Sequence, residues 1–196
     1  MDMLLPLAVF AFVSSITPGP NNAMLSASGI AFGFRRTIPH VFGVWVGFVT
    51  LLAVCGSGMG ALLERFPALV TALRIAGSAY LLYLAWRMRK AFEPGEATRV
   101  GRPLRFHEAA AFQFINPKAW VMAITAVSVF GQVMEPFWLA LAAICIVFSI
   151  VNLPCICSWA ALGASIRPWL TSARRRSALG AVVAVLMVYS VVIMWL

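Results

Sequence analysis

Two short motifs in this sequence combine helix-breaking prolines with polar side chains. The first motif is Thr17-Pro18-Gly19-Pro20-Asn21-Asn22, and the second is Asn116-Pro117-Lys118. A proline removes a backbone hydrogen bond and its ring clashes with the preceding turn, so each motif should break a helix. The half-helix that begins near Asn21 then offers free N–H groups and a positive dipole end, and Lys118 adds a full charge. Together these groups favour binding of a carboxylate.

The same segments also supply hydrogen-bond acceptors. Carbonyl groups freed near residues 14–16 and the side-chain amides of Asn21, Asn22 and Asn116 can accept hydrogen bonds from an ammonium group. A site with both kinds of partner matches a zwitterion better than a metal ion or a simple anion. We therefore predict that the two motifs border a site for a small zwitterion.

The elements that carry these motifs have the composition of a membrane protein. Of 196 residues, 62% are hydrophobic and 11% are charged, against about 45–50% and about 25% in soluble domains. No soluble fold of this size could bury so much apolar surface, so the lipid bilayer must surround most side chains. The net charge of +9 lies in short basic clusters between apolar stretches. Such clusters are typical of topology signals and not of a surface that binds nucleic acid.

Six stretches are long enough to cross a bilayer, since a hydrocarbon core of about 30 Å needs roughly 20 residues of helix. They lie near residues 3–34, 38–62, 67–86, 108–131, 136–161 and 178–196. Basic residues gather after the first, third and fifth stretches, whereas the other connections carry few charges. The positive-inside rule therefore places the basic connections in the cytoplasm and both termini outside. If the first stretch were a re-entrant hairpin instead, the N-terminus would lie inside.

A basic cytoplasmic loop at 91–105 divides the predicted spans into two halves, about 1–90 and 106–196. Because each half has three spans, the second half enters the membrane in the opposite orientation, as in the inverted repeats of many secondary transporters. The prolines break the first and fourth spans at corresponding positions, where irregular backbone must line a cavity or pack against protein. We therefore predict a single all-α transmembrane domain over 1–196, with six transmembrane helices in two inverted three-helix halves and with helices 1 and 4 broken.

These motifs together resemble a known family. The segments 17–22, 33–35 and 77–87, the pair Gly43 and Gly47, and the run Asn116-Pro117-Lys118-Ala119-Trp120 follow one another in a characteristic order. Their order and spacing resemble the LysE/RhtB family of amino-acid exporters, also called LysE-type translocators. The resemblance runs from about residue 4 to the C-terminus. Ser26 to Gly29 and Phe112-Gln113 look most like the branch of cysteine and O-acetylserine efflux proteins.

The resemblance implies a multi-pass protein of the bacterial inner membrane that exports amino acids or their derivatives, driven by the proton gradient. Its partners would be the amino acid, protons and the lipid bilayer, and we expect neither a cofactor nor an enzyme activity. Carried over residue by residue, the resemblance assigns substrate binding to the signature positions Pro18, Gly19, Pro20, Asn21, Asn22, Asn116, Pro117 and Lys118.

Proton coupling requires a group that titrates during the transport cycle, yet no Asp or Glu lies inside a predicted span. The remaining candidates are Lys118 in the middle of the fourth span, Glu108 at its mouth, and His40 at the mouth of the second span. Lys118 could be the titrating switch or a fixed positive anchor, and His40 could be an ordinary interfacial residue. The lack of a buried acid argues against lysine and arginine as substrates and favours small neutral amino acids.

Two other classes of function fit the sequence less well. An exporter of cations or other inorganic ions of the same superfamily fold would need intramembrane carboxylate, imidazole or paired thiol ligands. A membrane-embedded enzyme would need a nucleophile beside a base, and the spans contain no suitable His or acid. We predict no metal site, because the cysteines lie in apolar stretches without metal or disulfide spacing: Cys55, Cys145, Cys155 and Cys157.

Small residues four positions apart predict where helices pack closely. The pairs are Gly29 and Gly33, Gly43 and Gly47, and Gly56 and Gly60. They permit a homodimer without requiring one. In the fifth span, Asn152 and Pro154 predict a kink that is a hinge, a cavity wall or a plain packing feature.

Overall fold

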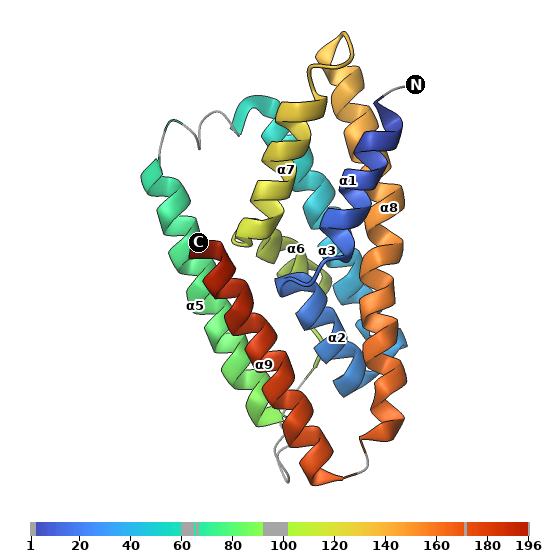
Figure 1. The fold of residues 1–196 in the computed structure, drawn as a ribbon, viewed down its shortest axis with the longest axis vertical. Coiled ribbons are helices and arrows are strands. Elements are labelled where there is room, and N and C mark those ends of the chain that lie inside the picture. Colours follow the sequence, from blue (N-terminus) through green and yellow to red (C-terminus); the bar gives the residue numbers. More distant parts are fainter. Residues whose placement is uncertain (1–2, 60–64, 66, 92–101, 171, 196) are drawn as a thin grey trace.

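A computed structural model describes residues 3–59, 65, 67–91, 102–170 and 172–195 (Figure 1). Throughout these residues the regular structure is helical, without a strand. The elements are α1 (Leu4–Ile16), α2 (Pro20–Phe32), α3 (Phe34–Val54), the π-helical turn η1 (Cys55–Met59), α5 (Pro67–Ala91), α6 (Phe106–Gln113), α7 (Pro117–Phe130), α8 (Phe137–Ile166), the short 3₁₀ turn η2 (Arg167–Trp169) and α9 (Ala173–Trp195).

The predicted spans coincide with these helices to within a few residues. The first span is divided into α1 and α2, which bend by 54°, and the fourth is divided into α6 and α7. In Figure 1, α2 continues toward the opposite end of the molecule from α1, as in a broken span rather than a hairpin. Among the described helices, α3 with its following turn and α8 are each long and apolar enough to cross a bilayer, as α1 and α2 are when counted together. The complete six-span topology stays a prediction.

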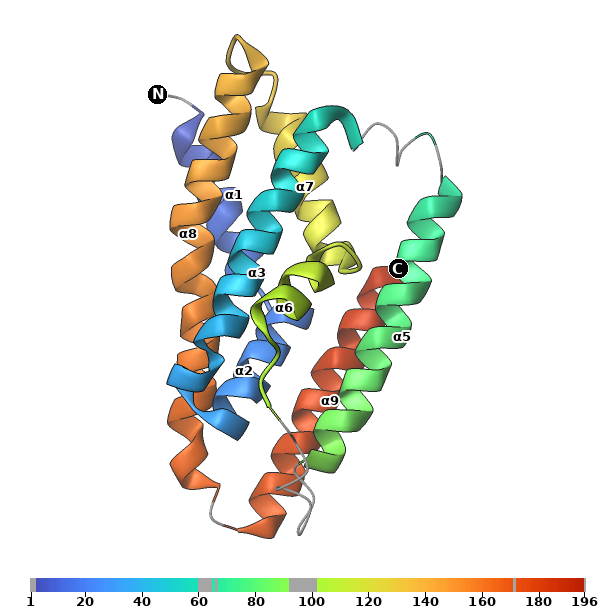
Figure 2. The ribbon, with the colours of Figure 1, turned by 180° about the vertical axis from the view of Figure 1, so that it is seen from behind.

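Connections that were predicted to share one side of the membrane lie toward the same end of the molecule. The α2–α3 junction and the α8–α9 connection lie at one end, and the N-terminus and the α7–α8 connection lie at the other (Figures 1 and 2). Helices α5 and α9 run side by side as a pair along one flank of the bundle. This arrangement agrees with the alternation of charge along the sequence.

Each broken pair of helices packs on a long helix from the other half of the chain. Helices α1 and α2 pack along α8, and α6 and α7 pack along α3, while α3 and α8 also contact each other. The two halves are therefore interleaved. At the breaks, Asn116 is buried, whereas Thr17 and Pro18 are exposed.

The α2–α8 contact depends on glycines at the crossing point. A Cβ atom on Gly29 would collide with the backbone carbonyl of Ala160, and one on Gly163 would collide with that of Ser26. Without side chains at these positions the two backbones approach directly, which favours van der Waals packing inside a membrane. The prediction of close packing at Gly29 is confirmed.

The α3–α6 contact is built in the same way. A Cβ atom on Gly43 would collide with the carbonyl oxygen of Phe106, and one on Gly47 would lie 2.6 Å from the Cα atom of Ala110. Both glycines are therefore packing residues, as predicted. This close crossing holds the first half of the second broken span against α3.

The remaining small residues have different surroundings. Gly33 ends α2 with a φ of 82°, a conformation that favours glycine. Gly56 lies against Leu141, and Gly60 is outside the described residues. The cysteines carry free thiols and are buried or half-buried: Cys55, Cys145, Cys155 and Cys157.

Apolar side chains fill the space between α1, α3, α7 and α8. Leu7, Leu51 and Ile144 are fully buried there, and the rings of Phe48 and Phe148 meet edge to face with centroids 5.3 Å apart. Because lipid is as apolar as these side chains, their contribution comes from close packing and not from removal of water. This packed region holds α1 and α7 side by side, which brings the two breaks together.

Candidate functional site

The first break has an extended backbone between two helices. α1 ends at Ile16, Thr17 has φ and ψ of −62° and 144°, and Gly19 is fully extended. Pro20 is the first residue of α2, where its missing N–H costs nothing. The proline motif therefore breaks the helix where the sequence predicted.

Side chains of the protein itself satisfy the carbonyls that the break frees. The side-chain amide of Asn22 donates to the carbonyls of Ser15 at 2.9 Å and Thr17 at 2.8 Å. The indole N–H of Trp159, from α8, donates to the carbonyl of Ile16 at 3.1 Å. Each of these carbonyls thus already has a partner within the protein, so the structure does not support the expectation that they are open to a ligand's ammonium group.

The second break separates α6 from α7. The helix ends at Gln113, and a tight turn leads to Asn116, whose side-chain oxygen accepts a hydrogen bond from the backbone N–H of Lys118 at 3.2 Å. The indole of Trp120 donates to the carbonyl of Phe114 at 2.9 Å. Asn116 is thus the N-cap of α7, a structural role that the sequence interpretation did not include.

Lys118 joins the second break to the first. Its Nζ atom lies 2.9 Å from both the carbonyl and the hydroxyl oxygen of Thr17 and 3.3 Å from the carbonyl oxygen of Pro18. A side chain on Gly19 would collide with Lys118, since a Cβ atom there would lie 2.8 Å from its Cδ. The glycine therefore admits the lysine to the C-terminal end of α1, where a positive charge is favourable.

A second link between the breaks consists of two amides. Asn21 donates from Nδ2 to Oε1 of Gln113 at 2.8 Å, and Gln113 donates from Nε2 to Oδ1 of Asn21 at 3.1 Å. Gln113 is fully buried and also donates to the carbonyl of Ala109. Its proximity to the break was visible in the sequence, but its bonding role was not predicted.

Asn152 of α8 lies against the first break. Its Nδ2 donates to the hydroxyl of Ser15 at 3.0 Å, while its buried Oδ1 has no hydrogen-bond partner within the described structure. Both residues line a small cavity of about 30 Å³, together with Asn21, Asn22 and Lys118. Asn152 is therefore part of a cavity wall, one of the alternatives that the sequence left open.

A larger cavity of about 530 Å³ lies between the broken helices and the α5–α9 pair. Its wall includes the first break, the second break and Lys118. The remaining polar lining comes from Ser14 of α1, Arg74 of α5, Thr125 of α7, and Tyr189 and Ser190 of α9. A cavity of this volume can hold a small organic molecule.

The structure brings all eight predicted signature residues to the breaks and their cavities: Pro18, Gly19, Pro20, Asn21, Asn22, Asn116, Pro117 and Lys118. It also adds Arg74, which the sequence interpretation missed. The available signal was a charged residue inside the predicted third span, because such residues normally face a cavity or a partner.

Two of the proposed coupling residues lie away from this cavity. His40 is 2% exposed, so the interpretation of it as an interfacial residue is wrong. It is buried because the close α3–α6 crossing covers its part of α3, and its Nδ1 has no hydrogen-bond partner in the described part of the chain. His40 lines neither of the cavities described above.

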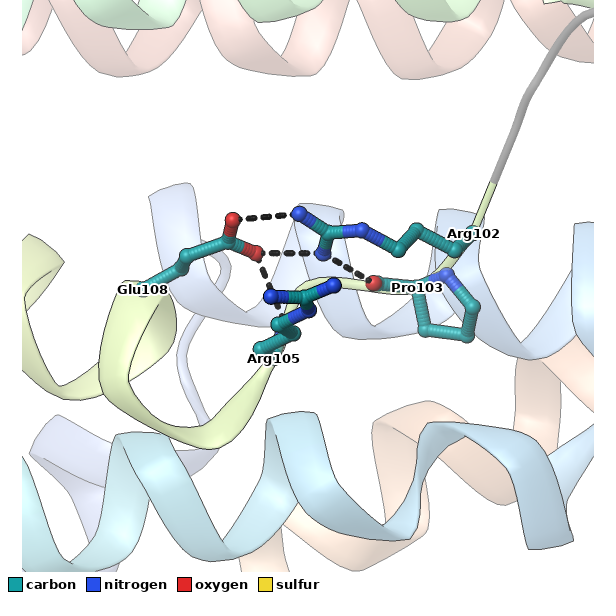
Figure 3. Close-up of polar contacts among 4 residues, drawn as sticks. All are labelled: Arg102, Pro103, Arg105 and Glu108. Atoms are coloured by element: carbon teal, nitrogen blue, oxygen red, sulfur yellow. Dashed lines mark hydrogen bonds and ion pairs between the residues drawn. The ribbon is translucent and has the colours of Figure 1, made fainter.

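Glu108 lies in the first turn of α6 and is held by neighbouring groups (Figure 3). Its two carboxylate oxygens accept hydrogen bonds from Arg102 at 2.6 and 2.7 Å, and one also accepts from the backbone N–H of Arg105 at 2.8 Å. The carboxylate thus caps the N-terminal end of α6, where negative charge is favourable. It does not border the cavity between the breaks.

The donor set of the cavity suits an organic ion better than a metal cation. Its described lining contains the cations Lys118 and Arg74 and no carboxylate, imidazole or thiol. Among the described residues, no group of three or more His, Cys, Asp or Glu side chains is placed to hold a metal ion.

Comparisons with known proteins identify the family of this chain. A family model described as LysE type translocator matches residues 12–193. A cysteine/O-acetylserine efflux protein of Klebsiella pneumoniae is 33% identical over 132 residues, which cover 66% of this chain and 67% of that protein. Proteins with the same description from Salmonella paratyphi A and Escherichia coli O1:K1 are 32% and 31% identical over 121 residues, which cover 62% of each chain. The matched segment thus spans less than two thirds of the length of the Salmonella and Escherichia proteins. No solved structure matches the chain.

Proposed function

Because this chain belongs to the LysE-type translocator family, we propose that it is a secondary transporter that exports an amino acid or amino-acid derivative from the bacterial cytoplasm. The relatives described as cysteine/O-acetylserine efflux proteins support a small neutral amino acid as the substrate. The protein would then act as a multi-pass protein of the inner membrane and not as an enzyme.

The observation that carries this proposal is the cavity of about 530 Å³ that borders both helix breaks. No side chain caps the N-terminus of α2 at Gly19, so its first N–H groups remain a favourable site for negative charge. Lys118 and Arg74 add positive charge to the same cavity. A substrate carboxylate fits this environment, and Thr125, Tyr189 and Ser190 offer hydroxyl acceptors for its ammonium group.

We propose that movement of the two inverted halves opens this cavity alternately to the cytoplasm and to the outside. The two halves pack in corresponding ways, α1 and α2 on α8 and α6 and α7 on α3, which supports their relation as inverted repeats. The links that Lys118 and Gln113 make across the breaks belong to one conformation, and substrate movement would require them to change. Nothing in this scheme requires a homodimer.

Export is proposed to be coupled to protons. Of the three candidate residues, Lys118 borders the cavity in the described structure, whereas Glu108 and His40 do not. A lysine that loses its charge when it leaves the Thr17 carbonyl would connect substrate movement to protonation. Lys118 is therefore the first candidate for the coupling residue.

The function is tested by feeding cells with dipeptides that release labelled amino acids and measuring intracellular accumulation with and without the protein. Expression should lower the accumulation of cysteine or another small neutral amino acid. Equal accumulation of every amino acid in both strains, with the protein present in the membrane, would contradict the proposal. As a control, the tolerance of the two strains to added metal salts is compared. Equal tolerance would argue against an exporter of inorganic ions.

A further inference from the structure

Arg74 is a charged residue inside a predicted span, and the described residues provide no counter-ion for it. It lies in α5, is half-buried and lines the same cavity as Lys118. It forms no hydrogen bond or ion pair with any residue that the structure describes. The sequence offers no acidic residue between Glu64 and Glu93, so α5 itself cannot supply a counter-ion.

The donors of Lys118 are already occupied in this conformation. An ammonium group has three N–H donors, and the Nζ atom has three acceptors within 3.3 Å, which belong to Thr17 and Pro18. Lys118 therefore contributes positive charge to the cavity but has no donor left for a ligand. The guanidinium group of Arg74 has five donors, none of them used by a described residue.

We propose that Arg74 is the residue that directly binds the carboxylate of the transported amino acid. This inference rests on the proposed export function. A guanidinium group matches a carboxylate with two parallel hydrogen bonds, which a lysine cannot form. The carboxylate then lies in the cavity between Arg74 and Lys118. Arg74 forms hydrogen bonds with it, and Lys118 stabilises it by charge alone.

The binding mode also predicts which part of the substrate is recognised. A ligand without a carboxylate, such as an amino-acid amide, loses the interaction with Arg74 and leaves a charged group unpaired. The transporter should therefore discriminate an amino acid from its carboxamide, and Arg74 should be the source of that discrimination.

The test uses the full-length protein reconstituted in vesicles of phosphatidylethanolamine and phosphatidylcholine. Transport of labelled L-cysteine, O-acetyl-L-serine and L-cysteine amide is measured for the wild type, Arg74→Gln and Arg74→Lys. For Arg74→Gln, the KM for the two amino acids should rise about 10- to 100-fold, as expected for loss of a charged hydrogen-bonded pair. The KM for the amide should stay unchanged, and Arg74→Lys should give an intermediate value.

Arg35→Gln is the matched control, because Arg35 is an exposed arginine at the α2–α3 junction that lines neither cavity. It should transport both amino acids with wild-type KM. Size-exclusion chromatography of each variant checks that it is folded, and Arg74→Lys provides a second test if Arg74→Gln is not.

Two results would overturn the assignment of Arg74. The first is that Arg74→Gln still prefers cysteine over cysteine amide as strongly as the wild type does. The second is an effect of the substitution that occurs only after phosphatidylglycerol is added, which would mean that Arg74 binds an anionic lipid. Failure of the wild type to move any amino acid would instead contradict the export function itself.

Discussion

The Nζ atom of Lys118 lies 2.9 Å from the carbonyl oxygen of Thr17, which is 101 residues earlier in the chain. The lysine of one helix break thus caps the C-terminal end of α1 at the other break. A cation is favourable there because the last carbonyls of a helix carry partial negative charge. The two breaks consequently form one structural unit, and substitutions in either should affect both.

Loss of the Lys118 side-chain charge should disable the transporter. Lys118→Met removes the bonds to Thr17 and Pro18 and one of the two positive charges in the cavity. We expect export to fall at least about tenfold, since hydrogen bonds to charged groups contribute about 1.5–3 kcal/mol. Efflux of labelled cysteine measures the effect, and an immunoblot of isolated membranes should show normal insertion. Export at the wild-type rate would mean that Lys118 is dispensable.

Asn21 and Gln113 should be energetically coupled. We expect Asn21→Ala and Gln113→Ala each to destabilise the protein, because each leaves the other side-chain amide with fewer partners, at a cost of about 1–3 kcal/mol. The double variant should be less destabilised than the sum, by about 0.5–1.5 kcal/mol. Thermal unfolding of the detergent-solubilised protein provides the four values of the cycle. Strict additivity would argue against a direct bond between the two side chains.

A methyl group at the α2–α8 crossing should separate the two helices. In Gly163→Ala the new Cβ atom meets the carbonyl of Ser26, and overpacking of this kind costs about 1–3 kcal/mol. The matched control is Leu162→Ala on the same helix, where the side chain is 52% exposed. Thermal unfolding should detect a clear loss for Gly163→Ala and little change for the control. Equal stability of the two variants would show that the crossing is looser than described.

Glu108 should not be the coupling residue. Its carboxylate is held by Arg102 and the start of α6 and does not border the cavity. We therefore expect Glu108→Gln to keep most of the export activity and an unchanged dependence of export on external pH. The measurement is efflux across a series of pH values, with Lys118→Met as the inactive reference. A flattened pH profile in Glu108→Gln would assign proton coupling to this carboxylate.

The helical segments and the two breaks follow from local patterns of residues. Apolar length decides which segments can be surrounded by lipid, and the prolines at positions 18, 20 and 117 each remove a backbone donor and disfavour a continuous helix through their motifs. These are local properties of the chain, so the bounds of α1, α2, α6 and α7 follow from it closely. The glycine pairs likewise indicated where backbones could approach.

Which groups at the breaks remain available to a ligand depends on the packing of helices that are distant in the chain. The carbonyl of Ile16 is taken by Trp159 and that of Thr17 by Lys118, each across more than 100 residues of sequence. The same reason explains His40 and Arg74. Helices distant in the chain cover His40, and they leave a cavity beside Arg74. Hydrogen-bond partners and cavities depend on which helices pack together, and a single sequence does not contain that information in any local pattern.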